Sequence, residues 1–151
     1  MKNILFVCTG NTCRSPMAEA LFRLRAGRKN PWKVSSAGLH VSGAYPASLE
    51  ARIVIGELGV DLSGHRSQAL TEALATEADL ILVMTESHRQ HLQANFPQVG
   101  HRVYLINELG TSKVHDISDP YGGSVEIYKK TRDEIERAVL ELIIFLRLGE
   151  S

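Results

Sequence analysis

The sequence predicts an α/β fold: a three-layer sandwich in which a central four-stranded parallel sheet is flanked by helices. Short apolar runs alternate with amphipathic stretches along the chain, which is typical of a parallel sheet between helix layers. The run at 80–84 is apolar throughout, as expected of a strand covered on both faces. The 151 residues show no repeat and no linker, so we expect a single domain over 1–151.

The first strand and the first helix flank a short polar loop, which we expect to be the active-site loop. The strand is predicted at 2–7 and the helix at about 16–26. Ser15 suits the N-cap of this helix, Pro16 its first position and Gly27 its C-cap. The inward face of the helix is expected to carry Met17, Ala20, Leu21 and Leu24.

The remaining elements follow from the same alternation. Strands are predicted at 32–35, 80–84 and 103–106, and helices at 46–58, 71–76, 86–96 and 125–148. The last helix is expected to turn one set of side chains inward: Tyr128, Ile135, Val139, Leu142, Ile143 and Leu146. A polar stretch at 107–124 follows the last strand. Because ligands bind at the carboxyl ends of parallel strands, this stretch can reach the same rim as the first loop.

The charge balance excludes several classes of partner. Lysine plus arginine and aspartate plus glutamate number 17 each, so any anion site has to be local. No apolar run approaches the ~20 residues of a membrane span. The short apolar N-terminal run also lacks the cleavage site of a signal peptide. We therefore expect a cytoplasmic protein with neither nucleic-acid nor membrane partners.

The two cysteines, Cys8 and Cys13, lie five residues apart. In a cytosolic chain, nearby cysteines are more often catalytic, redox-active or metal-binding than structural. A structural zinc site needs four clustered ligands, whereas the six histidines are scattered, so no metal is expected. His88 and His91, on a predicted helix, are interpreted as part of a solvated polar face.

The loop at residues 8–15 (CTGNTCRS) carries the residues of a phosphate site. A loop between a strand and a helix points successive N–H groups inward, and the helix dipole adds positive charge. Gly10 permits the unusual backbone geometry, and Arg14 offers a planar fork for two phosphate oxygens. This positive potential favours a thiolate at Cys8, a nucleophile for phosphoryl transfer, and the Ser15 hydroxyl can stabilise the departing sulfur. Taken singly, each residue fits packing, capping or a surface charge; their combination favours the phosphate site.

Phosphoryl transfer to sulfur also needs an acid for the leaving group and then a base for water. Asp119, in the sequence Asp-Pro-Tyr-Gly-Gly at 119–123, is the preferred candidate because Pro120 fixes the local backbone. Asp116 is the alternative. Turn formation is the usual role of aspartate in polar loops, and it applies to both.

The stretch at 7–20 (VCTGNTCRSPMAEA) closely resembles the signature of the low-molecular-weight protein tyrosine phosphatases. Further family segments recur in the same order: Ser35–Gly38, Gly64–Arg66, Asp79–Met84 and Asp119–Gly122. The resemblance covers essentially the whole chain. It implies a phosphocysteine formed on Cys8, a phosphoryl clamp at Arg14, and an acid that then acts as base at Asp119. It implies no metal and no cofactor.

The resemblance also implies roles for the surrounding residues. The expected substrate-binding residues are Thr9, Gly10, Asn11, Thr12, Cys13, Ser15 and Tyr121. Asn11 and Ser15 are expected to hold the loop in shape, supported from behind by Ser36 and His65. A reversible disulfide between Cys13 and Cys8 is expected to protect the nucleophile from irreversible oxidation. A packing role for Cys13 is the alternative.

Two departures from the family pattern bear on the substrate. Thr12 stands where most members have an aliphatic residue, and Gly122 where tyrosine-directed members often carry a second aromatic. Thr12 resembles the bacterial protein arginine phosphatases, which remove phosphate from phosphoarginine and are expected to act in stress signalling. A hydroxyl can hydrogen-bond a guanidinium, and a phosphotyrosine ring would find fewer stacking partners. The expected activity is hydrolysis of phosphoarginine on proteins; phosphotyrosine is the alternative.

Two other interpretations are weaker. A thioredoxin-coupled arsenate reductase needs further cysteines late in the chain, and none follows Cys13. A non-catalytic phosphoprotein-binding module would lack Cys8, Arg14 or the acid, and all are present. The expected partners are phosphorylated proteins, with phosphate or another oxyanion in the loop. The apolar surface of the last helix is compatible with a monomer or a weak dimer.

Overall fold

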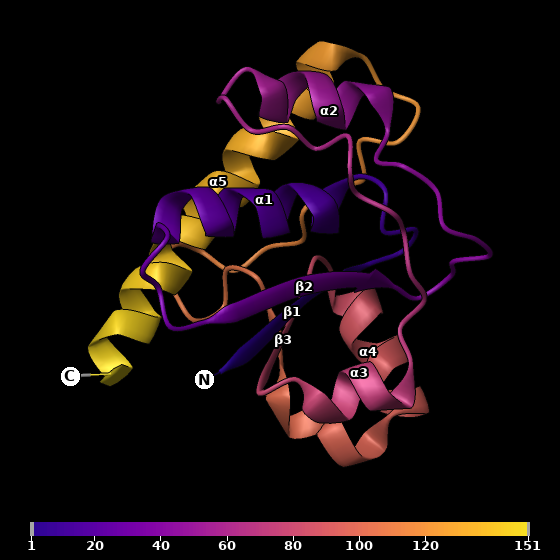
Figure 1. Ribbon diagram of the computed structural model, residues 1–151. Coiled ribbons are helices and arrows are strands. Elements are labelled where there is room, and N and C mark those ends of the chain that lie inside the picture. The colour runs from indigo at the N-terminus through magenta and orange to yellow at the C-terminus, as the bar shows by residue number, and fades with distance from the viewer. Residues whose placement is uncertain (1, 151) are drawn as a thin grey trace.

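The computed structural model describes residues 2–150 and contains the expected alternation of strands and helices (Figure 1). The strands are β1 (Asn3–Cys8), β2 (Lys33–Gly38), β3 (Leu80–Val83) and β4 (Val103–Leu105). The α-helices are α1 (Arg14–Ala26), α2 (Leu49–Gly56), α3 (Glu72–Glu77), α4 (Glu86–Asn95) and α5 (Val125–Glu150). A 3₁₀ helix, η1 (Pro97–Arg102), was not predicted. No helix within the described residues is long and apolar enough to cross a membrane.

The four strands form one parallel sheet, as predicted, and their order is β2-β1-β3-β4. β1 is hydrogen-bonded on both sides, with Cys8 opposite Gly38 of β2 and Val7 opposite Val83 of β3. The carboxyl end of β1, from which the polar loop departs, is therefore fixed between two neighbours.

Helices cover both faces of this sheet, which confirms the three-layer architecture. Figure 1 shows α1, α2 and α5 on one side and α3 and α4 on the other. Two hydrophobic cores result: the first lies between the sheet and α1, α2 and α5, and the second lies between the sheet and α3 and α4. Because side chains alternate along a strand, Ile4, Phe6 and Cys8 of β1 pack in the first core, whereas Leu5 and Val7 pack in the second. The six side chains of α5 that were expected to point inward are all buried in the first core.

The beginning of α1 differs from the prediction. The helix starts at Arg14, with Cys13 at the N-cap position and no side-chain cap, so Ser15 and Pro16 lie inside the first turn. Ser15 is not available as a cap because its hydroxyl is directed to the loop, where it contacts Asn11 and Cys8. Leu24 is also wrongly placed, being 37% exposed; Ala18 and Phe22 are buried instead.

Two further boundaries differ where elements support the loop. β2 runs three residues beyond its predicted end, to Gly38, where an added Cβ would lie 2.8 Å from the Thr9 carbonyl oxygen. α2 begins three residues later than predicted, at Leu49, because Ser48 caps it by accepting the Ala51 N–H. The Ser48 N–H also donates to the Thr12 carbonyl at 2.9 Å, which ties the start of α2 to the loop.

Candidate active site

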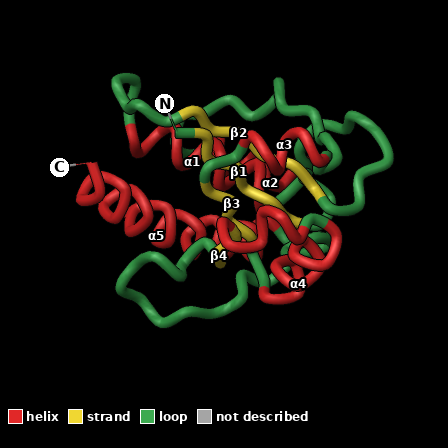
Figure 2. Tube along the Cα trace, turned by 90° about the horizontal axis from the view of Figure 1, so that it is seen from below, coloured by secondary structure: helices red, strands yellow, loops and turns green. Residues whose placement is uncertain are grey.

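The loop between β1 and α1 encloses a cavity of about 210 Å³. Its lining residues are Cys8, Thr9, Gly10, Thr12, Cys13, Arg14, Asp119 and Tyr121. The last two come from the connection between β4 and α5, which contains no helix or strand and is drawn as a green tube in Figure 2. Segments that are remote in sequence therefore meet at the carboxyl edge of the sheet, as expected.

Two hydrogen-bond donors are directed at the sulfur of Cys8, which is almost fully buried. The Asn11 N–H donates to Sγ at 3.3 Å, and the Ser15 Oγ lies 2.9 Å from Sγ. Because Ser15 Oγ already accepts an N–H from the Asn11 side chain at 2.8 Å, its own proton is free to point at the sulfur.

Asn11 fixes the shape of the loop. It is the one non-glycine residue among those described with a positive φ, 55°, a conformation that asparagine tolerates. Its side-chain amide also donates to Ser36 Oγ at 3.0 Å and accepts the Gln68 N–H at 3.0 Å. The His65 Nε2 lies 2.7 Å from its carbonyl oxygen. Ser36 and His65 thus both contact Asn11, and the supporting role that the family resemblance implies for them stays a prediction.

Not every expected substrate-binding residue lines the cavity. Thr9, Gly10, Thr12, Cys13 and Tyr121 do. Asn11 and Ser15 are fully buried and do not line the cavity, but both contact the sulfur of Cys8, which does line it. Their geometry fits the expected role in holding the loop in shape.

Arg14 links the loop to the segment that carries the aspartates. It is buried, and its Nη1 donates to the Ile117 carbonyl at 2.8 Å. Its Nη2 lies 3.7 Å from Asp119 Oδ2. The Ile117 N–H in turn donates to the Met84 carbonyl at the end of β3, at 2.8 Å. Ile117 is thus held on both sides, two residues before Asp119.

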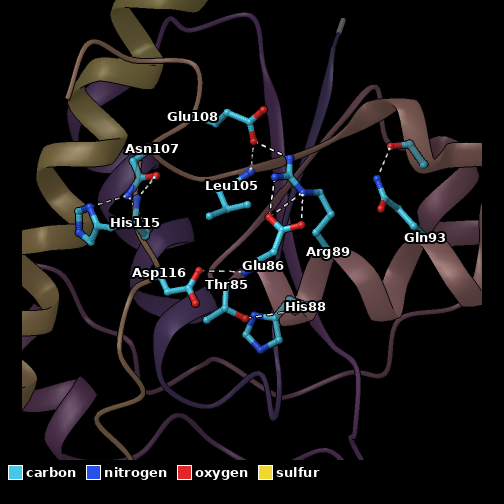
Figure 3. Close-up of polar contacts among 11 residues, drawn as sticks. Thr85, Glu86, His88, Arg89, Gln93, Leu105, Asn107, Glu108, His115 and Asp116 are labelled. Atoms are coloured by element: carbon cyan, nitrogen blue, oxygen red, sulfur yellow. Dashed lines mark hydrogen bonds and ion pairs between the residues drawn. The ribbon is translucent and has the colours of Figure 1, made fainter. Parts of the chain in front are cut away.

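The two candidate aspartates occupy different environments. Asp119 lines the cavity, and its side chain is 50% exposed; its Oδ1 accepts the Tyr121 N–H at 3.1 Å. Asp116 instead accepts the Glu86 N–H at 2.9 Å at the start of α4 (Figure 3). Asp116 is not among the residues that line the cavity. The geometry therefore favours Asp119 as the group that reaches a ligand.

Comparison with known proteins identifies the family of this chain. The model of the family described as "Low molecular weight phosphotyrosine protein phosphatase" matches residues 3–150. The chain belongs to this family.

Relatives with different named activities align along most of the chain. A protein-arginine-phosphatase of Bacillus subtilis (strain 168) is 44% identical over 141 residues, 93% of each chain. A probable low molecular weight protein-tyrosine-phosphatase, EpsP, of Ralstonia nicotianae is 40% identical over 139 residues, 92% of each chain. A structure of the YwlE arginine phosphatase, a mutant with a phosphorylated active-site serine, has a TM-score of 0.92 at 42% identity and covers 96% of this chain and 95% of that one.

The second cysteine of this phosphatase-family loop has a partner of its own. Cys13 Sγ lies 3.1 Å from the Tyr128 hydroxyl of α5 and 3.7 Å from Thr12 Oγ1. Burial raises the pKa of Tyr128 above its usual range, and the contact with Cys13 raises it further, so the phenol stays protonated. Both cysteines are buried free thiols, and the disulfide between Cys8 and Cys13 stays a prediction.

Sequence reasoning missed one residue at the family's phosphate loop, His88. The interpretation as a solvated side chain is wrong, because His88 is buried, and its Nε2 lies 2.9 Å from Thr9 Oγ1. His91 is half-buried and packs its ring against His40. One signal was present: His88 lies four residues before Leu92, the other buried residue of α4, and hence on the same helix face.

Proposed function

We propose that this chain hydrolyses phosphoarginine on proteins through a phosphocysteine intermediate. The observation that carries the proposal is the position of the Cys8 sulfur at an anion-binding loop, with Arg14 and Asp119 lining the same cavity. The Bacillus subtilis relative named as a protein-arginine-phosphatase supports the choice of substrate. Phosphorylated proteins are the proposed partners.

In the first step, the Cys8 thiolate attacks phosphorus. The loop N–H groups and the guanidinium of Arg14 bind the phosphoryl oxygens and the negative charge that they carry in the transition state. The sulfur–phosphorus bond forms as the phosphorus–nitrogen bond breaks. Asp119 gives its proton to the departing nitrogen, so the phosphorylated guanidinium leaves as the protonated guanidinium of arginine.

In the second step, a water molecule attacks the phosphocysteine. Asp119, now a carboxylate, takes a proton from this water as the new oxygen–phosphorus bond forms. The sulfur–phosphorus bond breaks, and the Ser15 hydroxyl, 2.9 Å from Sγ, donates to the thiolate that departs. Inorganic phosphate is released, which leaves Cys8 as a thiolate and Asp119 protonated, as at the start.

The cavity wall favours a guanidinium over a phenol. Thr12 places a hydroxyl-bearing side chain on the wall, where an aliphatic residue offers no hydrogen bond. Tyr121 is the one aromatic among the lining residues, and it is 78% exposed. Gly122, with a φ of 80°, adds no second ring beside it. A phosphotyrosine ring would therefore have few stacking partners.

Phosphotyrosine hydrolysis is the second candidate, because the relative at 40% identity is named a probable protein-tyrosine-phosphatase. The two candidates share the fold, Cys8, Arg14 and Asp119. They differ only in the group that leaves in the first step.

The test compares kcat/KM on matched phosphoarginine and phosphotyrosine peptides for the wild type and for Thr12→Ile. We expect the wild type to prefer phosphoarginine, and the variant to lose that preference while its phosphotyrosine activity rises. A wild-type preference for phosphotyrosine that the substitution leaves unchanged would refute the assignment and support the second candidate. Cys8→Ser, which removes the thiolate, serves as the inactive control on both peptides.

A further inference from the structure

We propose that Thr9, held in place by His88, is a second residue that selects the substrate. Its hydroxyl accepts a hydrogen bond from an N–H group of a phosphorylated guanidinium, and a phosphorylated phenol has no such group. The inference rests on the proposed function and adds to it a residue pair that the loop signature does not contain. It follows from three features: a fixed hydroxyl at the cavity wall, a neutral partner behind it, and the chemistry of the two leaving groups.

The Thr9 side chain is fixed at the cavity. Thr9 directly follows Cys8 and lines the cavity, and its Oγ1 lies 2.9 Å from His88 Nε2. Its backbone is held as well, because the Thr9 carbonyl accepts the His40 N–H at 2.9 Å. With both backbone and side chain engaged, the hydroxyl loses little further rotational freedom when a substrate binds.

His88 is itself held by the first turn of α4 (Figure 3). The backbone N–H of His88 donates to Oγ1 of Thr85, the N-cap residue of this helix, at 3.1 Å. Asp116 accepts the neighbouring Glu86 N–H at 2.9 Å, which satisfies another free donor of that turn. The imidazole is buried, so Thr9 is held by a rigid part of the fold.

The imidazole is also uncharged at neutral pH. Burial, helped by the charges of Arg14 and His91, lowers the pKa of His88 to about 4 against the opposite effect of Asp119 and Asp116. A neutral ring adds no positive charge that would repel a guanidinium. Its Nδ1 has no hydrogen-bond partner within residues 2–150. Since an unpaired buried N–H is rarer than an unpaired acceptor, we place the proton on Nε2, which then donates to Thr9.

The Thr9 hydroxyl keeps one acceptor site and its proton after the bond from His88. A phosphorylated guanidinium carries N–H groups beside its phosphoryl oxygens. An N–H group can donate to the free acceptor site of the Thr9 hydroxyl, and a phosphoryl oxygen can accept the Thr9 proton. A phosphorylated phenol offers the oxygens but has only ring carbons beyond the bridging atom. Thr9 therefore contributes more to binding the first substrate than the second.

The test uses Thr9→Val, which removes the hydroxyl at nearly constant shape, and measures kcat/KM on matched phosphoarginine and phosphotyrosine peptides. We expect about a tenfold loss on phosphoarginine, the size of one hydrogen bond to a charged group, and a smaller loss on phosphotyrosine. His88→Leu is expected to lower the ratio of kcat/KM on phosphoarginine to kcat/KM on phosphotyrosine, as Thr9→Val does. His88→Gln, whose side-chain amide can place an N–H near the position of Nε2, is expected to restore most of it.

Two controls separate this role from a general loss of structure. The double variant Thr9→Val/His88→Leu is expected to be no worse on phosphoarginine than Thr9→Val alone, because the two residues act through one hydroxyl. His101→Leu, an exposed histidine of η1, is expected to change neither rate.

Equal losses on both peptides, or additive effects in the double variant, would show a merely structural role and overturn the inference. An unchanged substrate ratio in Thr9→Val would overturn it as well, while leaving the proposed function standing if the wild type prefers phosphoarginine. A wild type inactive on phosphoarginine would overturn both.

Discussion

At the scale of single residues, the site depends on a side chain that does not line the cavity. Asn11 donates to the Cys8 sulfur, orients Ser15, and accepts support from Gln68. Its left-handed backbone conformation turns the loop back toward the sulfur. The nucleophile is thus positioned by hydrogen bonds from behind, which leaves the open side of the loop free for a phosphoryl group.

Asp119→Asn keeps the size of the side chain but removes the proton that the proposed mechanism transfers. We expect kcat to fall by at least about 10²-fold with a small change in KM, because substrate binding depends on the loop and Arg14. Steady-state kinetics on the preferred peptide measures this. Ser118→Ala, at the exposed neighbouring position, is the matched control and is expected to keep wild-type rates. Full activity in Asp119→Asn would transfer the acid role to another group, with Asp116 next to be tested.

The residues that meet at the cavity could be predicted because each belongs to a local pattern with a chemical meaning. Cys8 and Arg14 lie in one loop, and Asp119 lies in the polar stretch that was expected to reach the same rim. The contact of His88 with Thr9 could not be predicted, since the two residues are 79 positions apart in sequence. Only the parallel packing of β1 and β3 brings the start of α4 to that loop.

At the scale of elements, α4 connects the two segments that form the site. Its first turn holds the phosphate loop through His88 and the aspartate segment through Asp116. Farther along, Arg89 pairs with Glu86 of the same helix and with Glu108 of the connection to α5 (Figure 3). The connection is therefore attached to the helix at more than one point, although it contains no regular structure.

Asp116→Ala removes the acceptor for the Glu86 N–H. We expect the free energy of unfolding to fall by about 1 kcal/mol, the usual effect of losing a helix cap. We also expect kcat to fall, since Asp119 lies on the segment that Asp116 anchors. Urea unfolding and steady-state kinetics give the two values. Asp116→Asn, which keeps an acceptor oxygen, is expected to retain most of both; equal damage in the two variants would contradict the capping role.

Element types and order were predictable from sequence, but the boundaries near the site were not. Ser15 has the side chain of a good cap, yet it lies in the first turn of α1, where its hydroxyl contacts Cys8. β2 continues to Gly38 because tertiary pairing with β1 extends it past its apolar run. In both cases a contact with β1 overrides a local preference.

At the scale of the whole molecule, α5 closes the first core over α1 and α2. Leu142 is 1% exposed and Leu140 is 43% exposed on the same helix. We expect Leu142→Ala to lower the free energy of unfolding by about 2–5 kcal/mol, because it leaves a cavity in the core. The matched change Leu140→Ala is expected to stay within about 0.5 kcal/mol of the wild type. Chemical denaturation of both variants measures the free energy of unfolding. Similar losses in Leu142→Ala and Leu140→Ala would contradict the described burial.

Stability should depend on pH through His88. The pKa of His88 in the folded protein, about 4, lies below its ordinary value of 6.5, so the unfolded chain binds the proton more readily between these values. The contribution of His88 is fully present above pH 6.5 and is lost as the pH falls toward 4. We expect the free energy of unfolding to fall less steeply over this window in His88→Gln than in the wild type. Parallel pH curves for the two proteins would contradict this.

The long-range contacts of the site also constrain when it can form during synthesis. Arg14 donates to the Ile117 carbonyl, 103 residues later in the chain, and Cys13 contacts the Tyr128 hydroxyl, 115 residues later. On the ribosome the loop emerges before Asp119 and Tyr128. A nascent chain that stops before residue 117 therefore carries the thiol and the arginine without the acid. Catalysis begins only after the strands, α4 and the start of α5 have all left the ribosome.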